Sequence, residues 1–282
     1  MQTEPIMDVA HLGHLELLTP KPEESLQFFV NIMGMTESGR EGNSVYLRAY
    51  DDYERHSLKL TASKLPGLGH VAYRTRSPQA LERRVAALKG SGFDIGWNDG
   101  DLAHGPAFVC NDPDGHKIEL YYETQWYQAP PELRPALKNQ AQRFPARGIN
   151  VRRLDHWNGL AVDIEGNRAF FEKYLGFRLT EQIVLDNGTE AAMWMTCTNK
   201  SYDFAYSRDH TGVRGSFPSH HIRGQQPRRG ADRRGPLPRK WRLHRDRPAQ
   251  TRHPADLLLV RVRARRQPCG SRQRRSAPDS GS

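Results

Sequence analysis

Short apolar and alternating runs predict strands through the first 125 residues. They are HLGHLELLT (11–19), SVYLRAY (44–50), HSLKLTAS (56–63), GHVAYRT (69–75) and KIELYYE (117–123). Each run has the length and composition of a strand, and the turn NDPDGH precedes the last of them. The segment KPEESLQFFVNIMG instead has apolar residues at helical spacing, and Gly34 suits the C-terminus of that helix.

The same pattern returns at a single offset of 142 residues. The matching positions are His14 and His156, FF at 28–29 and at 170–171, and GM at 34–35 and GF at 176–177. Periods of 20–50 residues indicate solenoids, whereas one long offset without an insertion indicates two copies of a domain-sized module. The second copy has its own strand-like runs, LDHWNGLAVDI, AAMWMTCT and YDFAYS, and its own helix, NRAFFEKYLG.

These elements predict an α+β protein with antiparallel sheet character. The first domain is expected at 8–125, and a connection with four prolines follows at 126–150. The second domain starts at 151, and its recognisable pattern ends at 217. Residues 218–282 lack apolar periodicity and are expected to be irregular and disordered.

The net charge of +10 is distributed unevenly. After Phe217 the chain has 17 Arg and one Lys against four Asp and no Glu, a net charge of +14, so residues 1–217 carry −4. Seventeen arginines would bind phosphates non-specifically. Because Trp241 is the only aromatic residue interleaved with them, we expect no specific nucleic-acid partner.

The cysteines and the N-terminus indicate the compartment. Cys110, Cys197 and Cys269 are isolated, so they make neither a CxxC pair nor a disulfide framework. The N-terminus lacks a charged and then apolar signal, and no apolar run approaches the length of a membrane span. We therefore expect a reduced, cytoplasmic protein with no membrane partner.

Three residues of the first domain are candidate metal ligands. His14 lies in the first predicted strand, His70 in a later one, and Glu119 follows the DPDG turn. Two imidazoles and one carboxylate on neighbouring strands can bind one face of a divalent metal and leave the other positions open for substrate and dioxygen. A single buried histidine is more often structural, so the hypothesis depends on the three residues together.

The two-domain pattern resembles the vicinal oxygen chelate superfamily, and within it the type I extradiol dioxygenases. The motifs that carry the resemblance are RRLDHWNGLAVDI (152–164), FFEKYLGFRLTEQIV (170–184) and TNKSYDFAYSRDHTG (198–212), and it extends over residues 8–217. It implies two tandem domains of paired βαβββ modules. It also implies cleavage of catechol or a substituted catechol by O2 to a 2-hydroxymuconic semialdehyde, in aromatic-compound degradation, by a homo-oligomer that uses Fe(2+).

The resemblance also assigns roles to individual residues. It places Fe(2+) in the second domain, where His156 would be the first ligand, and gives His14, His70 and Glu119 structural duty. The family commonly has a catalytic histidine in the motif NK-x-H-D, where this chain has Tyr202 in NKSYD. A phenol can donate a hydrogen bond to dioxygen or substrate, although it carries no positive charge at neutral pH. The oxygen-stabilising role therefore falls to Tyr202 or to a neighbour such as His210.

The family pattern stops at Phe217. Relatives would continue with two adjacent histidines, an acid–base histidine, a tyrosine and an iron-binding glutamate. The second histidine ligand is replaced by Ser219, the acid–base histidine by Thr251, the tyrosine by Val260 and the glutamate by Gly270.

A one-base slip of the reading frame explains this loss. PSHHIRGQQ can be encoded as CCA TCA CAT CAC ATA CGC GGT CAA CAG, and the same bases read from the second position give HHITYAVN. Continued through 218–282, the shift restores a helix, two strands, an EPGGN turn and the missing ligands. We therefore expect the chain as written to lack ring-cleavage activity. The alternative function is a metal-binding or small-ligand-binding protein that uses only the intact first domain.

Overall fold

The computed structural model describes residues 5–138, 140, 147–149 and 151–212. The first βαβββ unit comprises β1 (Val9–Thr19), α1 (Pro22–Gln27), the π-helical turn η1 (Phe28–Ile32), β2 (Thr36–Glu41), β3 (Ser44–Arg48) and β4 (Leu58–Ala62). The second comprises β5 (Gly67–Thr75), α2 (Pro78–Leu88), β6 (Asp94–Asn98), β7 (Ala107–Asn111) and β8 (Lys117–Tyr121). After the 3-10 turn η2 (Pro131–Leu133), the third comprises β9 (Trp157–Ala161), α3 (Ile164–Phe170), η3 (Phe171–Leu175), β10 (Arg178–Val184), β11 (Glu190–Thr196) and β12 (Phe204–Arg208).

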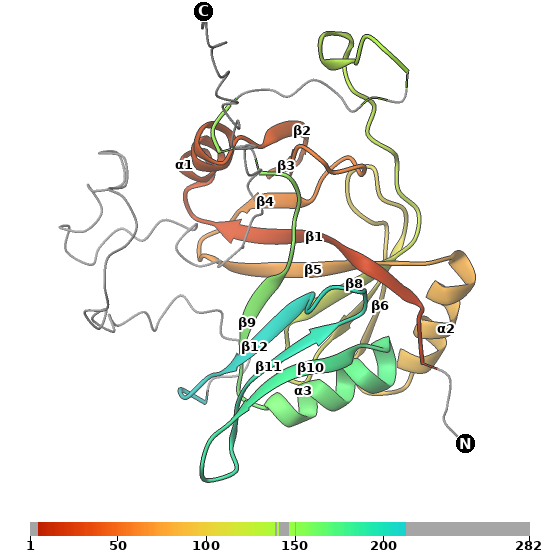
Figure 1. Ribbon diagram of the computed structural model, residues 1–282, viewed down its shortest axis with the longest axis vertical. Coiled ribbons are helices and arrows are strands. Elements are labelled where there is room, and N and C mark those ends of the chain that lie inside the picture. Colours follow the sequence, from red (N-terminus) through yellow and green to blue (C-terminus); the bar gives the residue numbers. More distant parts are fainter. Residues whose placement is uncertain (1–4, 139, 141–146, 150, 213–282) are drawn as a thin grey trace, which may run out of the picture.

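The first two units share one eight-stranded sheet, ordered β2-β3-β4-β1-β5-β8-β7-β6. In each unit the first strand pairs in parallel with the last one, and the antiparallel β1–β5 pair joins the units. The third unit forms a four-stranded sheet, ordered β10-β11-β12-β9, which Figure 1 shows below the β1–β5 pair. The α+β prediction of paired βαβββ modules is thereby confirmed for the first domain.

The repeat is also visible in the strand pairing. Leu15 pairs with Leu58 in the first unit, and its counterpart Trp157 pairs with Phe204 in the third, so the first strand keeps the offset of 142 residues and its partner lies 146 residues further along the chain. Both helices that the sequence predicts are shorter than expected, because each changes from α to π geometry at the FF pair. Gly176 ends the second helix with φ 73°, and a Cβ there would lie 2.5 Å from Ile6 Cβ, so only glycine fits.

The sequence analysis did not predict the longest helix, α2. Its signals are present, because Ser77 accepts a hydrogen bond from the Ala80 amide and Pro78 occupies the first turn. Leu81, Val85 and Leu88 then follow at helical spacing and are buried. Four strands were also missed. Of these, β2, β6 and β10 are polar or largely exposed, so they lack the apolar pattern that marks the predicted strands. The fourth, β7, is buried and apolar, and its run of four buried residues was not recognised as a strand.

A β-bulge at Gly13 determines which residues of β1 face the apolar core and which face the other side of the sheet. Gly13 is the extra residue between the pairs that Leu12 and His14 make with β5. The bulge leaves Leu12 and Leu15 in the apolar core, which is continuous with the core of the third unit, and turns His14 to the opposite face. A Cβ on Gly13 would lie 2.0 Å from the Tyr121 hydroxyl oxygen, so this crowded position requires glycine.

Buried polar contacts join the third unit to the first domain. Trp157 Nε1 donates to the Tyr73 hydroxyl over 2.8 Å, and Asn167 Nδ2 donates to Asp114 Oδ2 over 2.8 Å. Asp114 belongs to the DPDG turn, which the sequence predicted only as a connection between strands. The turn is therefore also a docking element for α3.

No helix in the described ranges is long and apolar enough to cross a membrane. The basic segment 218–282, which we expect to be disordered, lies outside the described residues. The positions of the four lost catalytic residues, Ser219, Thr251, Val260 and Gly270, lie there too.

Candidate functional site

Three neighbouring strands bring the predicted ligands of the first domain onto one face. His14 on β1 and Glu119 on β8 both pair with Ala72 on β5, so the three residues form one row across the sheet. His70 is two residues before Ala72 and therefore points to the same side. The small side chain of Ala72 leaves space between the two histidines and the carboxylate. The structure thus brings His14, His70 and Glu119 together, as the sequence predicted.

A fourth residue, Asp101, completes what we call the first-domain cluster, defined as His14, His70, Asp101 and Glu119. Their ligating atoms all lie within 4.8 Å of one another. The two Nε2 atoms of His14 and His70 are 2.9 Å apart, and Asp101 Oδ2 lies 3.0 Å from the first and 3.4 Å from the second. Glu119 Oε2 lies 3.5 Å from His70 Nε2.

Asp101 was missed because it lies in the loop between β6 and β7, outside any periodic pattern. Gly100 holds this loop in shape with φ 85°, and a Cβ there would lie 2.0 Å from the Gly105 carbonyl oxygen. This close backbone approach turns Asp101 back over the sheet. The glycines at 100 and 105 are the only sequence signal, and they do not identify the aspartate as a ligand.

Polar residues next to the cluster orient its side chains. Glu16 Oε2 is 3.0 Å from His70 Nδ1, and Asn98 Nδ2 donates to Glu119 Oε1 over 2.9 Å. Lys59 Nζ lies 2.6 Å from Asp101 Oδ1 and 3.4 Å from Glu16 Oε1. Every member of the cluster except His14 is therefore oriented by a hydrogen bond or an ion pair from a residue behind it.

The two histidines of the cluster have opposite pKa shifts. Burial lowers the pKa of His14 to about 3, and the hydrogen bond to Asp101 only partly opposes this effect. Burial also acts against charge on His70, but the carboxylates of Asp101 and Glu16 outweigh it and raise the pKa of His70 to about 9. These two pKa shifts together place one proton between His14 Nε2 and His70 Nε2, and it is held mainly by His70.

In the second domain, His156 occupies the position that matches His14. It is 7% exposed and immediately precedes β9, and its Nδ1 lies 3.0 Å from Asp155 Oδ2. With Nδ1–H donating to that carboxylate, Nε2 is left with a free lone pair, which is the tautomer that a metal ligand requires. The ring of Tyr202 contacts the His156 ring at 4.7 Å between centroids. The structure therefore places the two predicted residues of this site side by side.

The loop that presents Tyr202 is built around Asp203. This carboxylate is fully buried and accepts hydrogen bonds from the Cys197 amide at 2.8 Å and the Thr196 hydroxyl at 2.8 Å. Lys200 Nζ lies 2.7 Å from it. Burial raises the pKa of Asp203, but the ammonium of Lys200 and these donors outweigh burial, so the net pKa is lowered.

Replacing Asp203 with alanine is expected to lower the free energy of unfolding by about 2–4 kcal/mol, because several buried donors lose their acceptor. Since the folded pKa lies below the unfolded value of about 3.9, the contribution is complete above about pH 5 and is lost as pH falls through the folded pKa. Denaturant titration at pH 7, and at a series of pH values from 5 down to below the folded pKa of Asp203, measures both effects. The exposed Asp186→Ala variant should change stability by less than about 0.5 kcal/mol. An equally small effect at Asp203 would contradict its structural role.

His210, the alternative to Tyr202, is exposed and follows β12. Tyr202 comes just before Phe204, the β12 residue that pairs with Trp157 beside His156, whereas Arg208 at the other end of β12 pairs with Ala161. The strand therefore separates His210 from His156. Of the two candidates, only Tyr202 lies beside the predicted ligand.

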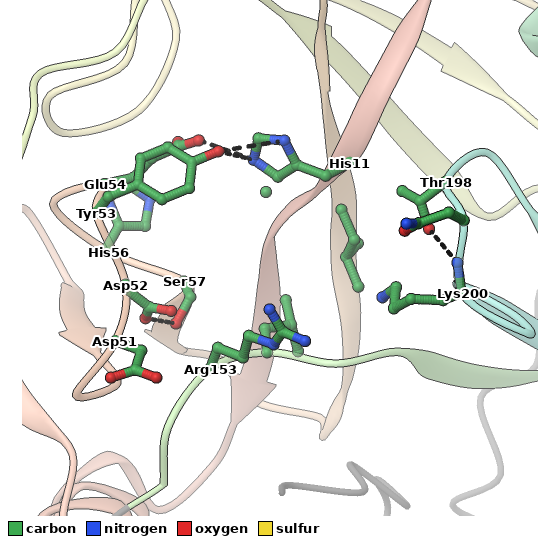
Figure 2. Close-up of a pocket in the computed structure, with 14 residues that line it drawn as sticks. His11, Asp51, Asp52, Tyr53, Glu54, His56, Ser57, Arg153, Thr198 and Lys200 are labelled. Carbon is green, nitrogen blue, oxygen red and sulfur yellow. Dashed lines mark hydrogen bonds and ion pairs between the residues drawn. The ribbon is translucent and has the colours of Figure 1, made fainter. Parts of the chain in front are cut away.

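A pocket of about 510 Å³ lies between the first domain and the start of the second. Figure 2 shows His11, Tyr53 and Glu54 grouped on one side and Arg153 and Lys200 on the other. Neither His156 nor Tyr202 lines this pocket. It is therefore separate from the candidate metal position in the second domain.

Comparison with known proteins shows that the chain is similar to dioxygenases. Residues 11–120 match the Glyoxalase/Bleomycin resistance protein/Dioxygenase superfamily. The chain is 45% identical over 219 residues to a metapyrocatechase of Geobacillus stearothermophilus, covering 78% of this chain and 66% of the relative. It is 33% identical over 207 residues to a manganese-dependent 2,3-dihydroxybiphenyl 1,2-dioxygenase of Geobacillus genomosp. 3, covering 73% and 65%. The chain thus spans just under two thirds of these relatives.

A solved structure supports the same assignment. The homoprotocatechuate 2,3-dioxygenase of Brevibacterium fuscum, in complex with 3,4-dihydroxyphenylacetate, superposes with a TM-score of 0.61 at 28% identity. The superposition covers 73% of this chain and 61% of that one. The dioxygenase relatives imply a catalytic metal, and one of them is named as manganese-dependent.

Proposed function

We propose that the chain, of which residues 11–120 match the Glyoxalase/Bleomycin resistance protein/Dioxygenase superfamily, descends from an Fe(2+)-dependent extradiol dioxygenase. The proposed ancestral reaction is cleavage of catechol, or of a substituted catechol, beside the two hydroxyl groups. Dioxygen is the second substrate, and the product is a 2-hydroxymuconic semialdehyde.

The observation that carries this proposal is the position of His156. It precedes β9 as His14 precedes Leu15 in β1, and the strand pairs that follow are equivalent. Its Nδ1 is engaged by Asp155, and Tyr202 packs against its ring. A first metal ligand with a phenol beside it suits a site that binds a diol and dioxygen.

The residues of the printed chain do not complete a metal site there. His156 is the only candidate ligand that the described part of the second domain supplies at this position. Its proposed partners correspond to Ser219 and Gly270, whose side chains do not replace an imidazole and a carboxylate. We therefore propose that this chain does not cleave catechol, and that 218–282 is read out of frame.

Fe(2+) is the metal that we infer for the ancestral site. Two imidazoles and one carboxylate suit non-haem Fe(2+) enzymes. The manganese-dependent relative makes Mn(2+) the second candidate. When bound, either ion supplies a Lewis-acidic centre with open positions for the two substrates. The chain's own contribution is the orientation of His156 by Asp155 and a hydrogen-bond donor at Tyr202.

Resequencing the gene between the codons of Gly215 and His221 tests the proposal directly. We expect one surplus base relative to the frame that encodes HHITYAVN. The length of the match to the metapyrocatechase, 219 residues, supports this because it is close to the 217 residues that precede the basic segment. An intact mass from the native host equal to that of the printed chain, together with ring-cleavage activity, would refute it.

A further inference from the structure

We propose that the first-domain cluster binds one divalent transition-metal ion independently of any metal at His156. The cluster is complete within the described residues, whereas the described part of the second domain, 151–212, offers His156 as a candidate ligand and no group of three or more. This site goes beyond the proposed ring-cleavage function, which assigns its metal to the second domain.

The distances within the cluster are those of ligands around one ion. Two atoms that are each about 2.1 Å from a metal lie about 3.0 Å apart at a 90° angle and about 3.4 Å apart at the tetrahedral angle. The separations between His14, His70 and Asp101 are 2.9, 3.0 and 3.4 Å. Glu119 lies 3.5 Å from His70. An ion can therefore enter without a change in the backbone.

The residues behind the cluster have the arrangement of a metal site's outer shell. His70 donates from Nδ1 to Glu16, which leaves its Nε2 lone pair directed at the cluster. A Cβ on Gly69 would lie 2.0 Å from Glu16 Oε2, so the glycine makes room for this carboxylate. Asn98 fixes Glu119 by a hydrogen bond to the oxygen that does not face His70.

The charge of the cluster also favours a divalent cation. Glu16, Asp101 and Glu119 carry three negative charges, and Lys59 supplies one positive charge within 3.4 Å of two of them. With both histidines neutral, the net charge of −2 lies in a mostly buried place, which is unfavourable without compensation. One divalent ion neutralises it.

Asp101 determines whether the metal site is closed and structural or open and catalytic. Two imidazoles and two carboxylates give four protein ligands, and a four-ligand site is closed, as structural metal sites are. Imidazole ligands favour Zn(2+), Co(2+) or Fe(2+) over Mg(2+) and Ca(2+), which prefer all-oxygen shells. We therefore assign the site to a structural ion of this class, with no open position for catechol.

The test uses the full 282-residue chain, stripped with a chelator and titrated with Zn(2+) by calorimetry and with Co(2+) by visible absorption. We expect one tightly bound ion per chain. His70→Gln and Asp101→Asn should each weaken binding at least about 100-fold, since ligand loss exceeds the 10–100-fold effect of outer-shell changes. Lys59→Met should strengthen binding about tenfold, because it removes a positive charge beside the ion.

Matched controls separate this site from other histidines. His11→Gln alters a histidine on the same strand as His14 but outside the cluster, and it should bind normally. His156→Ala should also bind normally, which keeps this result independent of the proposed function. A variant with alanine at His220, His221, His244 and His253 tests adventitious binding by the basic segment. Absence of a bound ion, loss of the ion in this variant, or unchanged affinity in folded His70→Gln and Asp101→Asn overturns the proposal.

Discussion

Deleting one base between the codons of Gly215 and His221 is expected to raise catechol cleavage from below detection to at least about 10³-fold above the level of the 282-residue chain. The chain as written has Ser219 and Gly270 where the second histidine and the glutamate ligands belong. The shifted frame supplies both residues, together with the acid–base histidine and the tyrosine. A complete ligand set should therefore restore metal binding and turnover at the same time.

The measurement is the appearance of the yellow semialdehyde after anaerobic reconstitution with Fe(2+), and separately with Mn(2+) because one relative depends on manganese. The metal content of the second domain is measured in the same samples. Deleting three bases at the same place is the matched control, because it shortens the segment without changing the frame, and it should restore nothing. Ring cleavage by the unrepaired chain would show that our reading of 218–282 is wrong.

The sequence predicted many, but not all, of the elements that bury an apolar pattern, since α2 and β7 are buried and were missed. The runs that became β1, β3, β4, β5 and β8 were identified because each packs one face on the core. By contrast, β10 is almost entirely exposed and was missed, because neighbouring strands rather than burial determine its position. The π-helical turns have no sequence signal apart from the recurrence of the FF pair itself.

In the candidate sites too, residues in strands could be predicted from the sequence, whereas a residue placed by a loop contact could not. His14, His70 and Glu119 could be grouped from the sequence because all three lie in strands, where position predicts the direction of a side chain. Asp101 could not, because its approach to the histidines depends on a backbone contact between Gly100 and Gly105 within a loop. The charge balance of the first-domain cluster likewise depends on Lys59 of β4, and the sequence does not show that this lysine pairs with Asp101.

In the repaired protein, His156→Ala is expected to abolish ring cleavage, with a loss of at least about 10³-fold, and to remove the metal from the second domain. His156 is buried, its Nδ1 is held by Asp155, and its Nε2 is left for the metal, so the alanine variant lacks an imidazole that is already oriented for coordination. Loss of a direct ligand should exceed the 10–100-fold weakening that outer-shell changes produce.

His210→Ala in the same protein is the matched control. His210 is exposed and is separated from His156 by the length of β12, so its variant should keep turnover within about threefold. Metal content measured per domain, with the first-domain cluster disabled by Asp101→Asn, distinguishes loss of the catalytic ion from loss of a structural one. If His156→Ala kept its metal and its turnover while His210→Ala lost both, the ligand would be His210, and the equivalence between His14 and His156 would have no functional meaning.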